Sequence, residues 1–362
     1  MTKPIYVTRP LLPSKEVLLK YIDDIYDSGR LTNHGPFVRQ LEEKLRDYLH
    51  VKNLILVANG TLALQIAYRA LNLNGHAIST PFSFVATTSS LVWERIKPIY
   101  ADIDPKRLTI DPTNVKKAIT PRTRGIVPVH VFGNPCDIEN IEEIATSNNL
   151  RVIYDAAHAF GVRYKGRSVL NYGDISTISF HATKLFHTIE GGAIITSNTE
   201  IAQKIRRMID FGITDIDKVE GLGINAKMNE FEAVMGLSVL ESVNDILENR
   251  RKLWSEYYDL LAGHVEFPEL APYTDWNYSY VPVLFKDESQ LLKVRERLNQ
   301  NNFYPRRYFY PSLNTLSYVN NKRSCPVSRN VSGRILCLPT YFGLEDEVVK
   351  KIAKVIKEGI AK

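Results

Sequence analysis

Short apolar runs alternate with amphipathic segments over the first two thirds of the chain. From about residue 53, apolar runs occur at 54–57, 97–101, 125–131, 150–154, 175–180 and 193–196. Segments with the apolar spacing of helices separate them, at 61–71, 83–94, 136–148 and 199–210. Strands that alternate with helices form a mainly parallel sheet with helices on both faces. We therefore predict an α/β fold, in which ligands bind beyond the carboxyl ends of the strands.

Further helices are expected on either side of this region. Apolar residues at helical spacing predict a helix over 14–26, and Pro36, which lacks an N–H, suits the first turn of a second helix. A helical pattern extends from near Met228 to about residue 261. It is long enough that we expect it to bend or to bridge to a second domain.

The last third of the chain has a different pattern. It contains apolar runs at 278–285 and 303–310, helical patterns at 287–299 and 345–360, and a loop-rich stretch at 311–335. This mixture predicts a smaller α+β domain. We therefore expect a large domain over residues 1–248, including the N-terminal helices, and a small C-terminal domain over residues 249–362.

The composition is that of a globular protein. Of the 362 residues, 44% are hydrophobic and 24% are charged, which excludes a largely disordered or fibrous chain. The 46 lysines and arginines against 40 aspartates and glutamates give a net charge of +6, which suits an anionic ligand. No tract of five or more basic residues occurs, so we do not expect nucleic acid as a partner.

Cysteine usage and the N-terminal sequence bear on the compartment. The three cysteines form no CxxC pair, which favours a reducing compartment and argues against a structural metal site. The N-terminus lacks the apolar core of a signal peptide, and no stretch reaches the ~18–20 apolar residues that cross a bilayer. We expect a cytoplasmic protein that binds neither a metal nor a membrane.

A turn after the first apolar run has the features of a phosphate site. The strand pattern at 54–57 leads through Asn59, Gly60 and Thr61 into a helix. The N–H groups at a helix N-terminus bind anions, and glycine lets the backbone approach closely. Thr61 adds a hydroxyl. The alternative interpretation is a helix cap with a tight turn.

Two polar residues follow the apolar run at 150–154. Asp155 comes directly after this strand pattern, where an unpaired carboxylate is costly and needs a cationic or hydrogen-bonding partner. A protonated pyridine nitrogen is one such partner, and capping of the next helix is the alternative. His158 follows three residues later and can face the same ligand, or it can be an ordinary helix histidine.

A lysine lies between two apolar strand patterns. Lys184 follows the run at 175–180, and a Glu-Gly-Gly turn leads into the next run. A buried lysine loses its charge unless it is paired, and a lysine with a lowered pKa is what a Schiff-base nucleophile requires. Ser179 precedes it and can reach the same phosphate as the turn at 59–61. An ordinary loop lysine is the alternative.

Together these pieces are the equipment for binding pyridoxal 5′-phosphate. In this order they resemble the DegT/DnrJ/EryC1/StrS family of sugar aminotransferases, which are fold-type I enzymes that depend on that cofactor. The matching segments are SGRLTNHGPFVRQLE, NGTLAL, TPFSFVAT, VIYDAAHAFG, SFHATK, EGGAIIT, GINAKMNEFEAVMGL and CLPTY. They extend from about residue 5 to residue 342, so the resemblance covers nearly the whole chain.

The resemblance implies a role for each matching residue around the cofactor ring. Lys184 matches the lysine that bonds the cofactor, and Asp155 matches the carboxylate at the pyridine nitrogen. His158 occupies the position that contacts the phenolic oxygen of the ring. Phe84 matches the aromatic residue that stacks on the cofactor, with core packing as its alternative role.

The resemblance also implies how the phosphate is held. Gly60, Thr61 and Ser179 match phosphate contacts within the chain. Asn225 matches a residue that reaches the phosphate from the partner subunit. The family resemblance therefore implies a homodimer with composite active sites.

Two residues depart from the family pattern. Relatives commonly have arginine at the position of Lys227 and glycine at the position of Ile189, and both positions lie around the substrate side of the site. The segments around Lys184 and Asn225 resemble most the viosamine-type enzymes of the family. Those enzymes aminate C4 of dTDP-4-keto-6-deoxyglucose.

Three further residues are candidates for substrate contacts. His187 can contact the sugar, and packing or exposure to solvent is its alternative. Arg306 and Arg307 suit a diphosphate, because guanidinium groups bind phosphate through paired hydrogen bonds. Plain surface charge is the alternative for both arginines.

The family resemblance implies a transfer of the amino group of glutamate to a nucleotide-linked keto sugar. The expected reaction converts dTDP-4-keto-6-deoxyglucose to dTDP-4-amino-4,6-dideoxyglucose, for O-antigen or other glycan biosynthesis. Alternatives are a C3 aminotransferase of a 3-keto sugar and a cofactor-dependent sugar dehydratase, in which histidine replaces the lysine. A non-enzymatic regulator would carry an additional DNA-binding segment. The residues do not select among dTDP, UDP and GDP.

Overall fold

A mixed sheet forms the centre of the molecule. The computed structural model describes residues 3–319 and 323–361, and within them the large sheet has seven strands in the order β2-β10-β9-β6-β5-β3-β4. Strand β10 is antiparallel to both of its neighbours, and the remaining pairs are parallel. In sheet order the strands are Asn53–Val57, Gly192–Thr196, Ile175–Ser179, Arg151–Asp155, Thr123–Val127, His76–Ser79 and Lys97–Tyr100. The predicted α/β class is confirmed.

Helices cover both faces of this sheet, because successive strand residues point to opposite sides. In β2, Leu54 and Leu56 enter the apolar cluster under α2, α5, α6 and α8. The intervening Ile55 and Val57 enter the cluster under α3, α4 and α7. These helices are α2 (Pro36–Leu49), α3 (Gly60–Ala70), α4 (Val85–Trp93), α5 (Pro112–Ala118), α6 (Ile138–Ser147), α7 (Thr199–Met208) and α8 (Glu230–Leu240).

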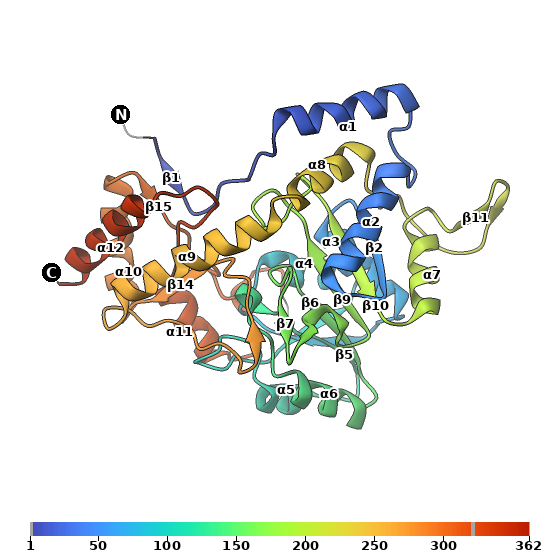
Figure 1. The fold of residues 1–362 in the computed structure, drawn as a ribbon. Helices are drawn as coiled ribbons and strands as arrows, with labels where there is room; N and C mark the ends of the chain where they lie inside the picture. The colour runs from blue at the N-terminus through green and yellow to red at the C-terminus, as the bar shows by residue number, and fades with distance from the viewer. Residues whose placement is uncertain (1–2, 320–322, 362) are drawn as a thin grey trace.

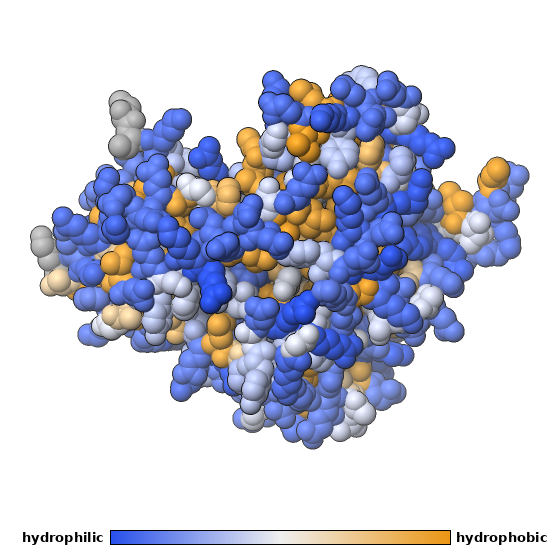
Figure 2. Space-filling model, in the orientation of Figure 1, coloured by the Kyte–Doolittle hydropathy of each residue, from blue (hydrophilic) through white to orange (hydrophobic). Residues whose placement is uncertain are grey.

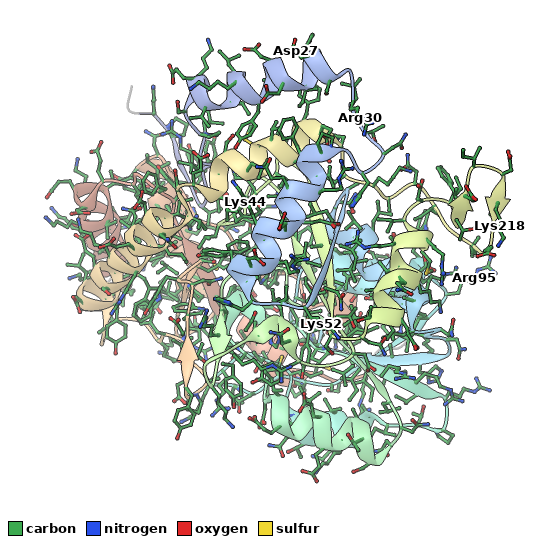
Figure 3. The ribbon with its side chains drawn as sticks, turned by 45° about the vertical axis from the view of Figure 1, so that its right-hand side comes forward. Asp27, Arg30, Lys44, Lys52, Arg95 and Lys218 are labelled. Atoms are coloured by element: carbon green, nitrogen blue, oxygen red, sulfur yellow. The ribbon has the colours of Figure 1, made fainter. Side chains whose placement is uncertain are left out.

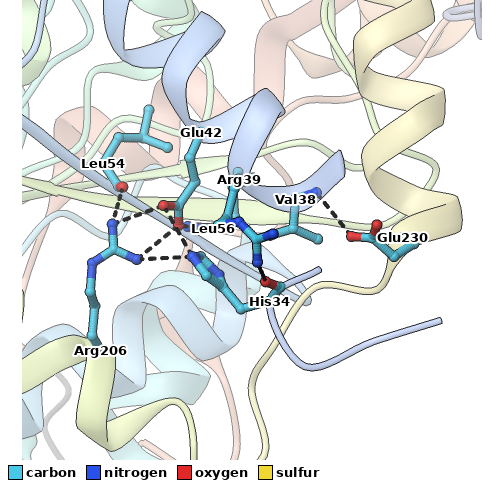
Figure 4. Close-up of polar contacts among 8 residues, drawn as sticks. All are labelled: His34, Val38, Arg39, Glu42, Leu54, Leu56, Arg206 and Glu230. Carbon is cyan, nitrogen blue, oxygen red and sulfur yellow. Dashed lines mark hydrogen bonds and ion pairs between the residues drawn. The ribbon is translucent and has the colours of Figure 1, made fainter. Parts of the chain in front are cut away.

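Two buried carboxylates attach helix α2 to this core. Glu42 of α2 accepts the backbone N–H of Leu56 at 3.0 Å and pairs with Arg206 of α7 at 2.8 Å (Figure 4). Glu230 accepts the N–H groups of Phe37 and Val38 at the start of α2. Proline therefore begins α2 as predicted, and a distant carboxylate supplies the acceptor for the first turn.

The long helical pattern is interrupted, as expected. Helix α8 ends at Leu240, two residues intervene, and α9 (Val243–Leu261) then leads from the sheet to the C-terminal segment (Figure 1). A separate apolar cluster lies there, built mainly from residues after 252. The predicted domain boundary at 248/249 lies inside α9, and the division into two domains stays a prediction.

The C-terminal segment contains helices packed beside a small sheet. Helix α9 and α12 (Asp346–Ile360) pack together, and α12 also packs on α10 (Glu288–Gln300). Strands β14 (Val281–Leu284) and β16 (Ile335–Leu338) pair antiparallel. The stretch at 311–335 is not all loop, because α11 (Pro326–Arg334) lies within it, with its first N–H groups bound by the carboxylate of Asp102.

Short elements complete the fold. Helix α1 (Lys15–Ser28) lies along the outside of α8 (Figure 1). Hairpin β11–β12 (Ile213–Asp215 and Lys218–Val219) projects from the body, with Lys218 on it (Figure 3). The other short pieces are β1 (Ile5–Tyr6), β7 (Arg163–Tyr164), β8 (Arg167–Ser168), β13 (Thr274–Asp275), β15 (Phe303–Tyr304) and 3-10 turns at Val131–Gly133, Val169–Asn171 and Leu313–Thr315.

None of the helices in the described ranges is long and apolar enough to cross a membrane.

Candidate active site

A cavity of about 340 Å³ opens at the carboxyl ends of the central strands. Asp155 ends β6 and Ser179 ends β9, so both side chains stand at this edge of the sheet. The turns that begin α3 and α4 meet the same edge. Of the residues predicted from the sequence, the cavity is lined by Gly60, Thr61, Phe84, Asp155, His158, Ser179, Lys184 and Arg306.

The start of α3 forms one end of the cavity. Asn59 caps the helix by accepting the N–H of Leu62 at 2.9 Å. The preceding N–H groups, at Gly60 and Thr61, belong to the first turn, which has no intrahelical acceptors. A Cβ atom at Gly60 would lie 2.9 Å from Cβ of Ser179, so only glycine lets these two segments meet. Backbone donors and the serine hydroxyl therefore converge where an anion can bind.

Asp155 is buried and its carboxylate is bonded on both oxygens. Oδ2 accepts the hydroxyl of Thr87 at 2.7 Å, and Oδ1 accepts the N–H of Ala157 at 3.2 Å. Burial raises the pKa of Asp155, and the bond from Thr87, the bond from Ala157 and the charge of Lys184 oppose that rise. The site thus holds a carboxylate that favours a nearby cationic partner.

Lys184 lies in the turn after β9, with its amine at the cavity. Its backbone N–H bonds the carbonyl of His181 at 2.8 Å. Burial lowers the pKa of Lys184 to about 8, and the carboxylate of Asp155 opposes this change. An amine with a pKa near neutrality is a nucleophile and a base under ordinary conditions.

His158 is held as a neutral ring. Its Nδ1 accepts the backbone N–H of Phe132 at 3.2 Å, which places the hydrogen of the neutral ring on Nε2. The ring stacks on Phe309 with centroids 5.5 Å apart. Burial keeps the pKa of His158 well below its ordinary value, so the ring is a hydrogen-bond donor without charge.

Phe84 occupies the mouth of the cavity. It immediately precedes α4, and its side chain is 52% exposed. A phenylalanine used only for core packing would be buried, as Phe82 is two residues earlier. The exposed ring therefore presents a free aromatic face at the entrance.

Three predicted residues lie outside this cavity. His187 is buried, its Nε2 lies 2.8 Å from the carbonyl of Leu11, and its Nδ1 accepts the N–H of Ile189. Both nitrogens are thus bonded to the backbone, which favours the packing alternative over a sugar contact.

Arg307 pairs with Glu288 at 2.6 Å. It is therefore turned away from the cavity, unlike its neighbour Arg306. Its guanidinium also bonds the carbonyls of Ser332 and Gly333 and lies over the ring of Tyr310. These contacts occupy the group that the sequence analysis assigned to a diphosphate. The contacts of Arg307 favour a structural role over a diphosphate contact, whereas Arg306 lines the cavity.

Asn225 is exposed and lies away from the cavity of its own chain. It pairs with Asp210 in an isolated bridge beside the projecting hairpin. The nearby Lys227 forms an ion pair of 2.5 Å with Asp210. The other departure from the family pattern, Ile189, has a φ of 73°, the left-handed region that favours glycine.

The structure brings in residues that the sequence analysis missed. Thr87 bonds Asp155, and Ser83 bonds Thr87 at 2.8 Å from the preceding turn. Ser83 and Thr87 are four residues apart in the predicted helical segment 83–94, a spacing that places two side chains on one side of a helix. No other feature of the sequence indicated these two residues. Aromatic residues of the C-terminal segment line the opposite wall, namely Tyr280, Tyr308 and Phe309.

Comparison with known proteins agrees with this geometry. Two full-length relatives have the name dTDP-4-amino-4,6-dideoxy-D-glucose transaminase. The one from Shigella dysenteriae is 42% identical, over 99% of this chain and 100% of the relative. The one from Escherichia coli is 38% identical, over 98% of both chains.

One solved structure is also similar to this chain over its full length. That of DesI in the presence of its TDP-sugar product is 32% identical, with a TM-score of 0.95 over 100% of this chain and 94% of the other. The model of the DegT/DnrJ/EryC1/StrS aminotransferase family matches residues 14–357. The resemblance found in the sequence is thereby confirmed, and the chain belongs to the DegT/DnrJ/EryC1/StrS aminotransferase family.

Proposed function

We propose that this protein uses pyridoxal 5′-phosphate to transfer the amino group of glutamate to a nucleotide-linked keto sugar. The observation that carries the proposal is one cavity holding Lys184, with a pKa of about 8, together with the buried carboxylate of Asp155. The same cavity ends on the anion site at the start of α3.

The cavity fits the cofactor on three separate counts. The turn at Gly60 and Thr61, with Ser179, offers backbone and hydroxyl donors to a phosphate. Asp155 offers a buried anion to a protonated pyridine nitrogen, and Lys184 offers a reactive amine.

Two further groups complete the proposed cofactor site. Nε2 of His158 is the donor available for the phenolic oxygen of the ring. The exposed face of Phe84 at the cavity mouth is the stacking surface. When bound, the cofactor supplies an electron sink for the carbanion that forms when the donor loses its α-proton.

The residues of this chain do the acid–base work around that sink. The Lys184 amine accepts the α-proton of glutamate and later returns a proton to the sugar carbon. Asp155 keeps the pyridine nitrogen protonated, because Thr87 and Ala157 hold the carboxylate in its charged form. His158, being neutral, donates a hydrogen bond without adding a second cation beside Lys184.

The proposed substrate is dTDP-4-keto-6-deoxyglucose, and the product is dTDP-4-amino-4,6-dideoxyglucose. The support is the name shared by the two full-length relatives, at 42% and 38% identity. Arg306 lines the cavity and is the guanidinium we assign to the diphosphate. The net charge of +6 favours the approach of an anionic nucleotide.

We also propose that the protein is a homodimer with shared active sites. Asn225, matched to a phosphate contact, lies outside the cavity of its own chain, so it would serve the site of a second copy. Apolar side chains are exposed on the adjoining segment, as Figure 2 shows on the projecting hairpin. They are Phe211, Ile213, Ile216, Val219, Leu222 and Ile224.

The proposed function is tested by supplying glutamate with dTDP-linked sugars that carry a 4-keto or a 3-keto group. Mass spectrometry detects the amine, and NMR locates the carbon that bears it. We expect kcat/KM to favour the 4-keto isomer by about 10²-fold, because a displacement of the reacting carbon by ~1 Å has that effect. A preference for the 3-keto isomer would replace the C4 assignment by C3. The proposed function would be overturned if no amino sugar formed with both isomers and with their UDP and GDP analogues.

A further inference from the structure

Tyr280 reaches the reactive lysine from the C-terminal segment of the chain. It lies just before β14, is buried, and lines the cavity. Nζ of Lys184 donates a hydrogen bond of 3.4 Å to its hydroxyl. Its ring meets the ring of His158 edge to face, with centroids 4.9 Å apart. One tyrosine therefore touches two groups that the proposed reaction needs.

The backbone before Tyr280 is held to the wall of the cavity by a buried amide. Nδ2 of Asn277 donates to the carbonyls of His158 and Phe160, each at 2.9 Å. Its Oδ1 accepts the N–H of Ser279 at 3.2 Å. A fully buried amide with these bonds fixes the position of the loop, because breaking any of them would leave a polar group unpaired. The loop that carries Tyr280 is thus tied to the loop that carries His158.

A buried arginine holds the same backbone from the other side. Nη1 of Arg250, on α9, donates to the carbonyls of Ser279 at 3.2 Å and Thr340 at 2.6 Å. Across the described ranges, Arg250 forms no ion pair with a carboxylate, although it is almost fully buried. Burial lowers the pKa of Arg250 to about 10. Burying such a charge is costly, and the buried guanidinium binds the carbonyl of Ser279, the residue next to Tyr280.

We infer that Tyr280 is the positioning residue for Lys184, holding its amine at the reacting carbon when that amine is free. The inference rests on the role of Lys184 in the proposed function. A lysine side chain has four rotatable bonds, so its free amine can occupy many positions. The Tyr280 hydroxyl selects one of them, and the contacts of Asn277 and Arg250 keep that hydroxyl in place.

The test is Tyr280→Phe in the full-length protein stripped of cofactor. Acetylation of lysines by a limiting amount of acetic anhydride over a range of pH, read by peptide mass spectrometry, measures the pKa of Lys184. Phenylalanine removes an acceptor for the charged amine, while Asp155 is unchanged, so we expect the pKa of Lys184 to fall by about one unit. A pKa equal to that of the wild type would overturn the inference.

The matched control is Tyr257→Phe. Tyr257 is also fully buried, and its hydroxyl donates to the carbonyl of Pro339 at 2.9 Å, away from the cavity. Tyr257→Phe also removes one hydrogen bond of a buried hydroxyl, here as the donor and away from Lys184, so it reports the effect of a lost buried hydroxyl on stability alone. We expect its Lys184 pKa to equal that of the wild type. An equal fall in both variants would overturn the inference.

A second substitution keeps the test decisive if Tyr280→Phe is poorly folded. Replacement of Tyr280 by 3-fluorotyrosine keeps the shape and weakens the oxygen as an acceptor, so a smaller fall in the same direction is expected. No fall would count against the inference. In the loaded enzyme, Tyr280→Phe should lower kcat about tenfold with an unchanged KM for glutamate.

Labelling of Lys184 requires no sugar substrate. Failure to aminate any keto sugar would therefore overturn the proposed function alone, and the labelling comparison would still decide the role of Tyr280.

Discussion

The hydroxyl of Thr87 donates a hydrogen bond of 2.7 Å to Oδ2 of Asp155. Thr87 lies in the first turn of α4 and Asp155 at the end of β6, 68 residues apart. Ser83 completes a short chain of hydroxyls that leads to the carboxylate. This bond opposes the effect of burial, which raises the pKa of Asp155. The charge of the carboxylate therefore depends on a residue of another element.

Thr87→Val should move the acid limb of the pH–kcat profile to higher pH. The carboxylate of Asp155 is active when charged, so activity is present above its pKa and is lost as the pH falls through it. Valine keeps the shape but removes the donor, so the pKa of Asp155 rises further. We expect a shift of about one pH unit, since a hydrogen bond to a charged group is lost.

Thr87→Ser is the control, because it keeps the hydroxyl and should keep the profile of the wild type. An unchanged acid limb in Thr87→Val would show that this bond does not govern Asp155.

Asp155→Asn should leave the fold intact and lower kcat by about 10²–10⁴-fold. The amide has the size of the carboxylate but no charge with which to keep the pyridine nitrogen protonated. Steady-state kinetics with glutamate measures the loss, and circular dichroism checks the fold. A loss of less than about tenfold would contradict the proposed role.

Lys184→Ala should remove turnover and the covalent attachment of the cofactor. Alanine leaves no amine to bond the cofactor or to move the proton. Absorbance spectra of the purified variant and mass spectra after borohydride reduction measure the attachment. Transamination at the wild-type rate would refute the assignment, whereas Lys52→Ala, at an exposed position, should behave as the wild type.

Lys184→Met should stabilise the cofactor-free protein at pH 7 by on the order of 2 kcal/mol. The pKa of Lys184 is lowered from 10.5 to about 8, so at pH 7 the folded state holds a charge that burial disfavours. Between pH 8 and 10.5 the unfolded chain binds more protons than the folded one, and the wild type regains stability as the pH rises.

The difference between Lys184→Met and the wild type should thus shrink over pH 8–10.5. Thermal unfolding at pH 7 and pH 10 measures it. A difference that does not depend on pH would mean that lost packing or charge elsewhere causes the effect.

Subunit mixing should restore activity if the site is shared between two chains. A Lys184→Ala dimer and an Asn225→Asp dimer should each be inactive, since the aspartate repels the phosphate. After exchange, a mixed dimer has one site with both native residues, so about a quarter of wild-type activity is expected with random pairing and equal amounts. Native mass spectrometry verifies the exchange. No recovery after verified exchange would place the whole site within one chain.

Local patterns were enough to predict the α/β class and the polar ends of its strands. The apolar run at 54–57 and the helical spacing of α2 extend over a few residues each, so both patterns can be recognised without the fold. Parallel strands bring their carboxyl ends to one edge, which is why Asp155 and Ser179 meet as expected. Strand β3 was missed, because only Ala77 and Ile78 of its four residues are apolar, so it forms no apolar run.

Contacts between distant segments were decided by the tertiary structure alone. The sequence has no signal that Tyr280 reaches Lys184, 96 residues away, because no local period relates a loop before β14 to a turn after β9.

Arg306 and Arg307 are neighbours with the same chemistry, yet only Arg306 lines the cavity. Glu288 and the carbonyls of the last turn of α11 bind Arg307, and these partners come together only when the C-terminal segment folds. The sequence thus determined which elements form and which residue types end them, through local periodicity. The tertiary structure decided which side chains face the cavity, because burial, charge and hydrogen-bond partners depend on all segments packed around it.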